Sequence, residues 1–188
     1  MKNYESYAEE ERQHLVHVYK RFPVCFESGK GVRLYDTEGK EYLDFASGIA
    51  TNALGYAHEE FNDAIKAQLD KITHTYNIFY NTQTPAAAKA VKKITGMDKV
   101  FFTNCGTEAI ETALKTARAY GYPKGTGRYE IIAMKNSFHG RSMGALSVTE
   151  NPHYREPFLP LIPGIKFAKY NDIESVKEFI GTRTCAII

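Results

Sequence analysis

The stretch that decides the fold is Phe101-Phe-Thr-Asn-Cys-Gly-Thr-Glu-Ala-Ile-Glu-Thr-Ala-Leu-Lys-Thr-Ala-Arg118. Its apolar start predicts a strand at residues 99–103, Gly106 predicts a turn, and the residues that follow predict an amphipathic helix over 107–120. Backbone N–H groups at a helix start have no partner within the helix, and the helix dipole favours negative charge there. The order strand, glycine turn, helix is therefore typical of a phosphate-binding corner, and also of an ordinary strand-to-helix connection.

The expected helix has an inner and an outer side. Its inward positions carry apolar residues at helical spacing: Ile110, Ala113, Leu114 and Ala117. Glu111 and Lys115 are four residues apart, so we expect them to pair on the outer side.

A second informative segment is Asn136-Ser-Phe-His-Gly-Arg-Ser142. A strand is expected at 129–134, so this segment forms the loop at the carboxyl end of that strand. Ligands of open α/β sheets bind at the carboxyl ends of strands. We therefore expect Phe138 and Arg141 to line one crevice with the corner at residues 106–107.

Further elements alternate along the chain. Strands are expected at 24–27, 32–36, 41–45, 165–168 and 184–188, with turns at Gly29/Gly31 and at residues 37–40. Helices are expected near the start, over 58–72, from a Thr84-Pro85 start to Gly96, over 144–148, and from a cap at Asn171 to Phe179. This pattern predicts an α/β fold with a mostly parallel sheet and helices on both faces. We expect an N-terminal arm with small-domain strands over 1–55 and part of a large α/β domain over 56–188.

Composition narrows the classes of function. The chain has 188 residues, of which 43% are apolar, which is ordinary for a globular protein with one sizeable core. The formal net charge is +2 with the charges interspersed, so we expect no nucleic-acid partner and no membrane partner. Residues 1–11 resemble neither a secretory signal nor a transit peptide, and no apolar run has transmembrane length. Cys25, Cys105 and Cys185 are far apart, which argues against a disulfide framework or zinc site and favours a cytoplasmic compartment.

The two motifs together resemble class III, fold type I aminotransferases, which use pyridoxal 5'-phosphate. A third run supports the resemblance, Asp44-Phe-Ala-Ser-Gly-Ile-Ala-Thr-Asn-Ala-Leu-Gly-Tyr-Ala-His58, and the likeness extends from about Tyr19 to Ile188. Within the family the chain is most similar to the acetylornithine-type members. The resemblance implies a homodimeric enzyme of arginine biosynthesis. It would transfer the terminal amino group of N2-acetyl-L-ornithine to 2-oxoglutarate.

The resemblance also implies roles for single residues. Gly106 and Thr107 match the positions that hold the cofactor phosphate, and Cys105 stands beside them where serine, a better phosphate donor than a thiol, is commoner. Phe138 matches the ring that stacks on the cofactor pyridine. Arg141 matches the arginine that binds the substrate α-carboxylate through two parallel hydrogen bonds.

Two further residues of the substrate site are expected from the family. Ile49 matches a position at the wall of the substrate site, and Tyr19 is expected to approach the substrate; packing in the small domain is the alternative for both. His139 is given no catalytic role. No lysine of this chain matches the family's Schiff-base lysine, which we expect beyond residue 188. We expect the acidic residue that protonates the pyridine nitrogen there too. We therefore expect an N-terminal portion of a longer enzyme that is inactive by itself.

Other hypotheses stay open on the sequence. The enzyme could be another ω-aminotransferase, acting on succinylornithine, ornithine or 4-aminobutyrate. The chain could instead be a non-catalytic phosphate- or nucleotide-binding α/β module, or a partner subunit without activity of its own.

Overall fold

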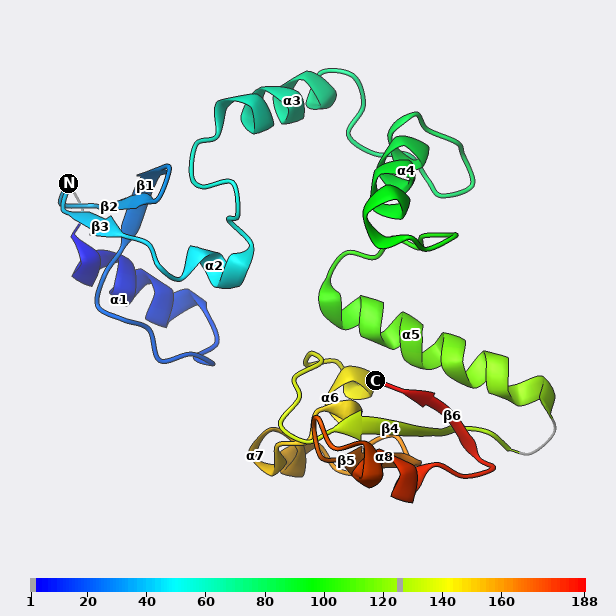
Figure 1. Ribbon diagram of the computed structural model, residues 1–188. Helices are drawn as coiled ribbons and strands as arrows, with labels where there is room; N and C mark the ends of the chain where they lie inside the picture. Colours follow the sequence, from blue (N-terminus) through cyan, green and yellow to red (C-terminus); the bar gives the residue numbers. More distant parts are fainter. Residues whose placement is uncertain (1–2, 125–126) are drawn as a thin grey trace. The chain divides into compact units, whose positions relative to one another are not determined.

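The computed structural model describes residues 3–124 and 127–188. The chain divides into two compact units, Met1–Thr82 and Gln83–Ile188 (Figure 1). The expected boundary near residue 55 refers to the domains of a complete enzyme and stays a prediction.

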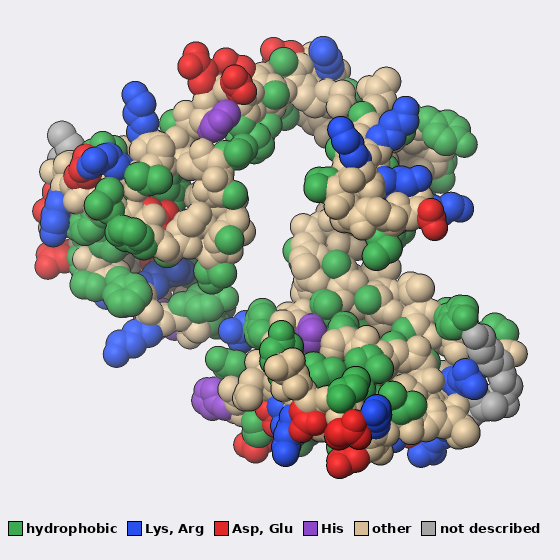
Figure 2. Space-filling view, viewed as in Figure 1, with side chains coloured by type: hydrophobic (Ala, Val, Ile, Leu, Met, Phe, Trp, Pro, Cys, Tyr) green, Lys and Arg blue, Asp and Glu red, His purple; other side chains and the backbone are tan. Residues whose placement is uncertain are grey.

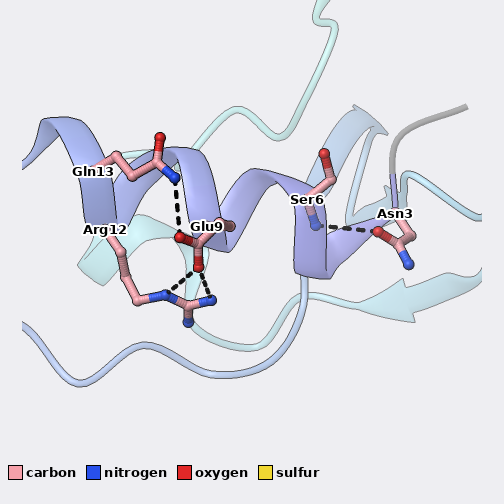
Figure 3. Close-up of polar contacts among 5 residues, drawn as sticks. All are labelled: Asn3, Ser6, Glu9, Arg12 and Gln13. Carbon is pink, nitrogen blue, oxygen red and sulfur yellow. Dashed lines mark hydrogen bonds and ion pairs between the residues drawn. The ribbon is translucent and has the colours of Figure 1, made fainter.

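The N-terminal unit begins with a polar helix, α1 (Tyr4–His14). The side chain of Asn3 accepts a hydrogen bond from a backbone N–H of the first turn, so it caps the helix. One turn later Glu9 accepts hydrogen bonds from Arg12 and Gln13 (Figure 3). Contacts between residues three and four apart thus support a helix that buries none of its residues.

Three antiparallel strands follow in the order β1 (Phe26–Lys30), β2 (Arg33–Asp36) and β3 (Glu41–Leu43). Gly31 and Gly39 supply the two turns with φ of +58° and +80°, a region that glycine enters without a steric penalty. This meander confirms the expected strands with shifted ends. β1 begins at residue 26 rather than 24, because its pairing with β2 begins there.

Two helices complete the N-terminal unit, α2 (Ser47–Ala50) and α3 (Glu59–Leu69). The ring of His58 caps α3 by accepting the N–H of Phe61 at 3.3 Å, so the helix begins one residue later than predicted. None of residues 3–82 is fully buried. Figure 2 shows hydrophobic side chains spread over the visible surface of this unit.

The second unit opens with α4 (Gln83–Thr95), which ends at Gly96 with φ +71° as predicted. The predicted cap at Thr84 is wrong, because the helix already begins at Gln83. Pro85 therefore lies inside the first turn, where its missing N–H removes no helical hydrogen bond.

A parallel sheet forms the centre of this unit, in the order β5 (Ile165–Ala168), β4 (Glu130–Met134) and β6 (Thr184–Ile187). The remaining elements are α5 (Gly106–Gly121), η1 (Tyr122–Lys124), α6 (Met143–Val148), α7 (Pro152–Arg155), η2 (Glu156–Phe158) and α8 (Ile173–Phe179). The central strand β4 has buried apolar residues at three successive positions, as a parallel strand covered on both faces requires.

Alternate residues of β4 pack on opposite faces of the sheet. Ile131 belongs to a core with Leu114 of α5 and Val148 of α6. Ile132 belongs to a second core with Val176 of α8. Helices therefore cover both faces, with α5 and α8 on opposite sides (Figure 1), and the predicted α/β architecture is confirmed.

Two further expectations for the elements of this unit are wrong. Residues 99–103 form no strand, because an extended segment becomes a strand only by hydrogen bonding to a neighbour, and the described residues provide none. Asp172, not Asn171, caps α8: its carboxylate accepts the N–H of Ser175 at 3.1 Å. Asn171 precedes the cap with φ +58°.

None of the described helices has the length and apolar character needed to cross a membrane.

Candidate functional site

The amino terminus of α5 presents backbone donors that no protein group uses. Cys105 is the N-cap residue, it is exposed, and its side chain makes no hydrogen bond to the helix. The first helical hydrogen bond runs from Ala109 N–H to the Cys105 carbonyl at 3.1 Å. The amides of Gly106, Thr107 and Glu108 thus have no acceptor among the residues that the structure describes. Three such donors at the positive end of a helix dipole favour an anion.

Gly106 is not needed as glycine by the chain itself. Its φ lies outside the left-handed region, and a Cβ at this position would meet no heavy atom within 4 Å. Neither backbone conformation nor packing therefore accounts for the glycine. A ligand that approaches the backbone closely would account for it.

The loop at residues 138–142 contacts this helix end directly. The hydroxyl oxygens of Thr107 and Ser142 lie 2.9 Å apart, and Ser142 N–H donates to Thr107 Oγ1 at 3.4 Å. Gly140 has φ +129°, and a Cβ there would lie 2.2 Å from Thr107 Oγ1. Glycine at 140 is thus required for the close approach. The structure brings the expected phosphate corner and the loop of Phe138 and Arg141 together.

A second contact joins α5 to the helix that follows the loop. Glu111 Oε1 accepts hydrogen bonds from the N–H groups of Gly144 and Ala145, at 2.8 Å and 3.2 Å. The predicted pair of Glu111 with Lys115 is wrong. The carboxylate instead satisfies two of the free amides at the start of α6.

Phe138 and Arg141 stand on the exposed side of the loop. The Phe138 side chain is 62% exposed. The guanidinium carbon of Arg141 lies 5.8 Å from the Phe138 ring centroid and 5.3 Å from that of Tyr154. Arg141 forms no ion pair with a carboxylate within residues 3–124 and 127–188. An exposed ring and a guanidinium without a carboxylate partner among the described residues are thus available to a flat aromatic group and a carboxylate.

His139 is more buried than its neighbours Phe138 and Arg141. Its ring Nε2 is buried and has no partner among the described residues, and its backbone N–H donates to Thr149 Oγ1 at 3.1 Å. Burial lowers the pKa of the imidazole, so the neutral ring is favoured. This placement supports a packing role, and the expectation that His139 is not catalytic stays a prediction.

Comparison with known proteins decides the family. The sequence model described as Aminotransferase class-III matches residues 15–188. This chain belongs to the class III aminotransferases. The expected family and its fold are confirmed.

Curated relatives of this class III aminotransferase chain include two bacterial proteins. It is 47% identical over 176 residues to the acetylornithine aminotransferase of Aquifex aeolicus, covering 93% of this chain and 47% of the relative. It is 45% identical over 178 residues to that of Clostridium acetobutylicum, covering 94% and 46%. The chain thus spans about half the length of the curated relatives it matches.

Solved structures agree with this class III assignment. The ornithine aminotransferase of Toxoplasma gondii ME49 superposes with a TM-score of 0.92 at 30% identity, covering 100% of this chain and 45% of that chain. The acetylornithine aminotransferase of Elizabethkingia anophelis gives a TM-score of 0.80 at 30% identity, covering 100% and 44%.

Two of the three substrate-site residues expected for a class III aminotransferase, Ile49 and Tyr19, lie in the N-terminal unit. Ile49 is 93% exposed, with φ +55°. All residues of α2 have positive φ, namely Ser47, Gly48, Ile49 and Ala50. A β-branched residue in a left-handed turn is strained, and such strain collects at functional sites.

Tyr19 is 61% exposed and lies beside Arg21, whose guanidinium carbon is 5.8 Å from the ring centroid. Neither Tyr19 nor Ile49 is packed into the described part of its unit, so the alternative of a packing role finds no support there. Their contact with substrate stays a prediction.

Sequence reasoning assigns no role to Gly140 or Ser142, and it gives Glu111 only a pair with Lys115. One local signal was available, because a serine directly before a short apolar helix is typical of an N-cap. The contacts of Gly140 and Glu111 join segments far apart in the chain, and no local pattern reports them. Within the described ranges no cluster of three or more His, Cys, Asp or Glu could hold a metal ion.

Proposed function

We propose that the complete protein is a pyridoxal 5'-phosphate-dependent aminotransferase of arginine biosynthesis. It would transfer the terminal amino group of N2-acetyl-L-ornithine to 2-oxoglutarate. The observation that carries this proposal is the direct contact between the amino-terminal end of α5 and the loop of Phe138 and Arg141. The relatives at 45% and 47% identity, both named acetylornithine aminotransferase, support the choice of substrate.

The residues present fit the cofactor. A phosphoryl dianion needs several oriented donors and close backbone approach. The start of α5 offers three amides without an acceptor among the described residues, and the open space at Gly106 leaves room. Phe138 is 62% exposed and belongs to the loop that contacts Thr107. The bound cofactor would supply the electron sink for amino-group chemistry.

The protein's own groups would bind the cofactor and orient the substrate. The amides of Gly106 and Thr107 would hold the phosphate, while the Thr107 hydroxyl contacts Ser142 at the end of the loop. Phe138 would stack on the pyridine. The Arg141 guanidinium binds the substrate carboxylate through two parallel hydrogen bonds, which determines the face that the substrate presents. Ile49 and Tyr19 contribute to the wall of the substrate site.

Cys105 places a weak donor beside the phosphate. Its thiol makes no capping hydrogen bond, so it is free to turn toward the anion or away from it. It therefore borders the phosphate without being the main ligand.

We also propose that the complete enzyme is a cytoplasmic homodimer, with residues 1–55 in its arm and small domain and 56–188 in its large domain. The family resemblance supports these statements.

Ornithine is the second candidate amino donor. The specific observation in its favour is the TM-score of 0.92 with a protein named ornithine aminotransferase. The higher identity to the acetylornithine-named relatives favours N2-acetyl-L-ornithine.

The test uses the complete protein encoded by the reading frame that contains these residues. Pyridoxal phosphate is added and the absorption spectrum is recorded. Glutamate formation from 2-oxoglutarate is then measured with N2-acetyl-L-ornithine, ornithine, N2-succinylornithine and 4-aminobutyrate. We expect a new absorption band and the highest kcat/KM with N2-acetyl-L-ornithine. A protein that never binds the cofactor would be the non-catalytic module instead, and a higher kcat/KM with another amine would change the substrate.

A further inference from the structure

Glu111 of α5 is hydrogen-bonded to the start of α6, the helix that follows the loop of Phe138 and Arg141. We propose that Glu111 is a positioning residue that holds the loop of Phe138 and Arg141 in place against the phosphate-binding end of α5. This inference rests on the proposed function.

Spacing along α5 is the first argument. Thr107 and Glu111 are four residues apart, so they lie on the same face of the helix, one turn after the other. Thr107 contacts Ser142, and Glu111 contacts Gly144. The loop that carries Arg141 is therefore attached to α5 at two successive turns.

The fit between Glu111 and Gly144 is the second argument. A Cβ on Gly144 would lie 2.2 Å from Glu111 Oε2 and 2.6 Å from Oε1. Only glycine at 144 leaves room for the carboxylate, so the two positions match each other in shape as well as in hydrogen bonding.

The need of α6 for this carboxylate is the third argument. Ser142 is its N-cap residue, but the serine side chain makes no capping hydrogen bond to the helix. Gly144 and Ala145 are fully buried, so water cannot easily satisfy their N–H groups. Glu111 replaces the local cap with one from a different helix. The start of α6, and with it the end of the loop, is thereby fixed relative to α5.

This arrangement predicts a local consequence. Without the carboxylate, α6 keeps its buried side chains but loses its attachment at the amino end. The loop then moves relative to the phosphate-binding amides. Arg141 loses its orientation toward the substrate carboxylate, while the sheet core beneath is little changed.

The experiment compares Glu111→Ala with Glu111→Gln in the complete protein. Amide hydrogen exchange of residues 138–145 is measured without cofactor, and KM for the amino-acid substrate is measured with it. In Glu111→Ala we expect the exchange to be about tenfold faster and KM to rise about tenfold, as for loss of a helix cap. Exchange in β4 should not change. Glu111→Gln keeps one acceptor oxygen and should recover most of both losses.

Two further variants separate the explanations. Lys115→Ala should behave like the unmodified protein, because the effect of Glu111 does not come from a pair on its own helix. Gly144→Ala displaces the carboxylate without changing charge and should show the same faster exchange and higher KM as Glu111→Ala. If Glu111→Ala does not fold, Gly144→Ala takes its place in the experiment. Unchanged exchange in residues 138–145, equal acceleration in β4, or no rescue by glutamine would each overturn the inference.

The two proposals fail in different ways. If the unmodified protein binds no pyridoxal phosphate, the proposed function is lost, and the exchange data alone decide whether Glu111 fixes the loop. If it binds the cofactor and turns over substrate, but Glu111→Ala leaves exchange and KM unchanged, only the positioning role is lost.

Discussion

The two units of this chain carry their candidate site residues in different ways. Phe138 and Arg141 stand on a loop that is hydrogen-bonded to α5, next to a sheet whose central strand has Ile131 and Ile132 at 1% and 0% exposure. Ile49 and Tyr19 belong to a unit in which none of the described residues is fully buried. Phe138 and Arg141 are thus placed by contacts inside their own unit. Ile49 and Tyr19 are exposed, and Ile49 stands in a strained turn.

This difference has a physical consequence. A side chain or backbone group held by buried neighbours transmits a small change to the whole site, because packed interiors cannot deform gradually. An exposed residue on a left-handed turn transmits little to its surroundings, but its own backbone strain is open to relief. Substitutions in the second unit should therefore affect binding, whereas those at α2 should affect stability and selectivity.

Arg141→Ala should give the largest effect. Loss of a two-bond contact to a carboxylate is expected to lower kcat/KM of the complete enzyme about 100-fold to 1,000-fold. Steady-state kinetics measure it, with Arg12→Ala in α1 as control, since Arg12 makes an exposed pair with Glu9. Equal losses in both variants would show that Arg141 has no special role.

Gly140→Ala should come next. Its Cβ would lie 2.2 Å from Thr107 Oγ1, and φ of +129° disfavours any side chain, so the loop must move off α5. We expect cofactor affinity to fall about tenfold or more and the free energy of unfolding to fall by about 1–3 kcal/mol. Gly181→Ala is the control, because nothing lies within 4 Å of its added Cβ. A Gly140→Ala protein with unchanged affinity would contradict the close fit of loop and helix.

Ile49→Gly should have a moderate effect and, unlike Gly140→Ala, should stabilise the fold. Relief of the left-handed conformation at φ +55° should outweigh the added flexibility of glycine and raise the free energy of unfolding by about 1 kcal/mol. Ile65→Gly, inside the right-handed helix α3, should lower it by about 1 kcal/mol. Denaturant titration measures both. If both variants lose stability, α2 is not strained.

Lowering the pH should give the smallest effect, a loss of folding stability in both units. Hydrogen bonding from Lys166 and the charge of Arg183 hold the pKa of Glu130 below its ordinary value of 4.5, against the effect of burial. The hydroxyl of Tyr56 and nearby backbone N–H groups hold the pKa of Asp44 below 3.8. Each ionised carboxylate therefore stabilises the fold above its ordinary pKa, and that stabilisation is lost as the pH falls through the lowered value.

Two amide variants test this pH dependence. Glu130→Gln and Asp44→Asn should each be less stable than the unmodified protein near neutral pH, and the differences should shrink below pH 4.5 and 3.8 respectively. Thermal unfolding across this range measures them. A difference that grows as the pH falls would reverse the sign of the argument.

The sequence predicts the second unit well wherever the signal is local. The apolar runs of β4 and β5 and the periodic helix α5 appear within a residue or so of their expected positions, because burial on a sheet or helix face leaves a periodic pattern. Gly96 ends α4 as predicted. Residues 99–103 have the same apolar pattern but no strand, since a strand also needs a neighbour to bond with.

The sequence predicts which residues belong to the candidate site, but not the hydrogen bonds that join them. The motifs indicate Gly106, Thr107, Phe138 and Arg141. The hydrogen bond that brings them together joins Thr107 to a residue 35 positions later, and such contacts leave no local trace. Glu111 illustrates the same limit, because the i, i+4 pattern indicates Lys115 while the fold offers two buried N–H groups instead.

The most direct test of the central claim is pyridoxal phosphate affinity in Gly106→Ala, measured beside the thermal midpoint of the cofactor-free protein. A Cβ at 106 meets no heavy atom of the described residues within 4 Å, and alanine favours helices, so the midpoint should stay the same or rise slightly. The added methyl would occupy the space above the free amides, so affinity should fall about tenfold or more. Unchanged affinity with unchanged stability would show that no phosphate lies against the start of α5.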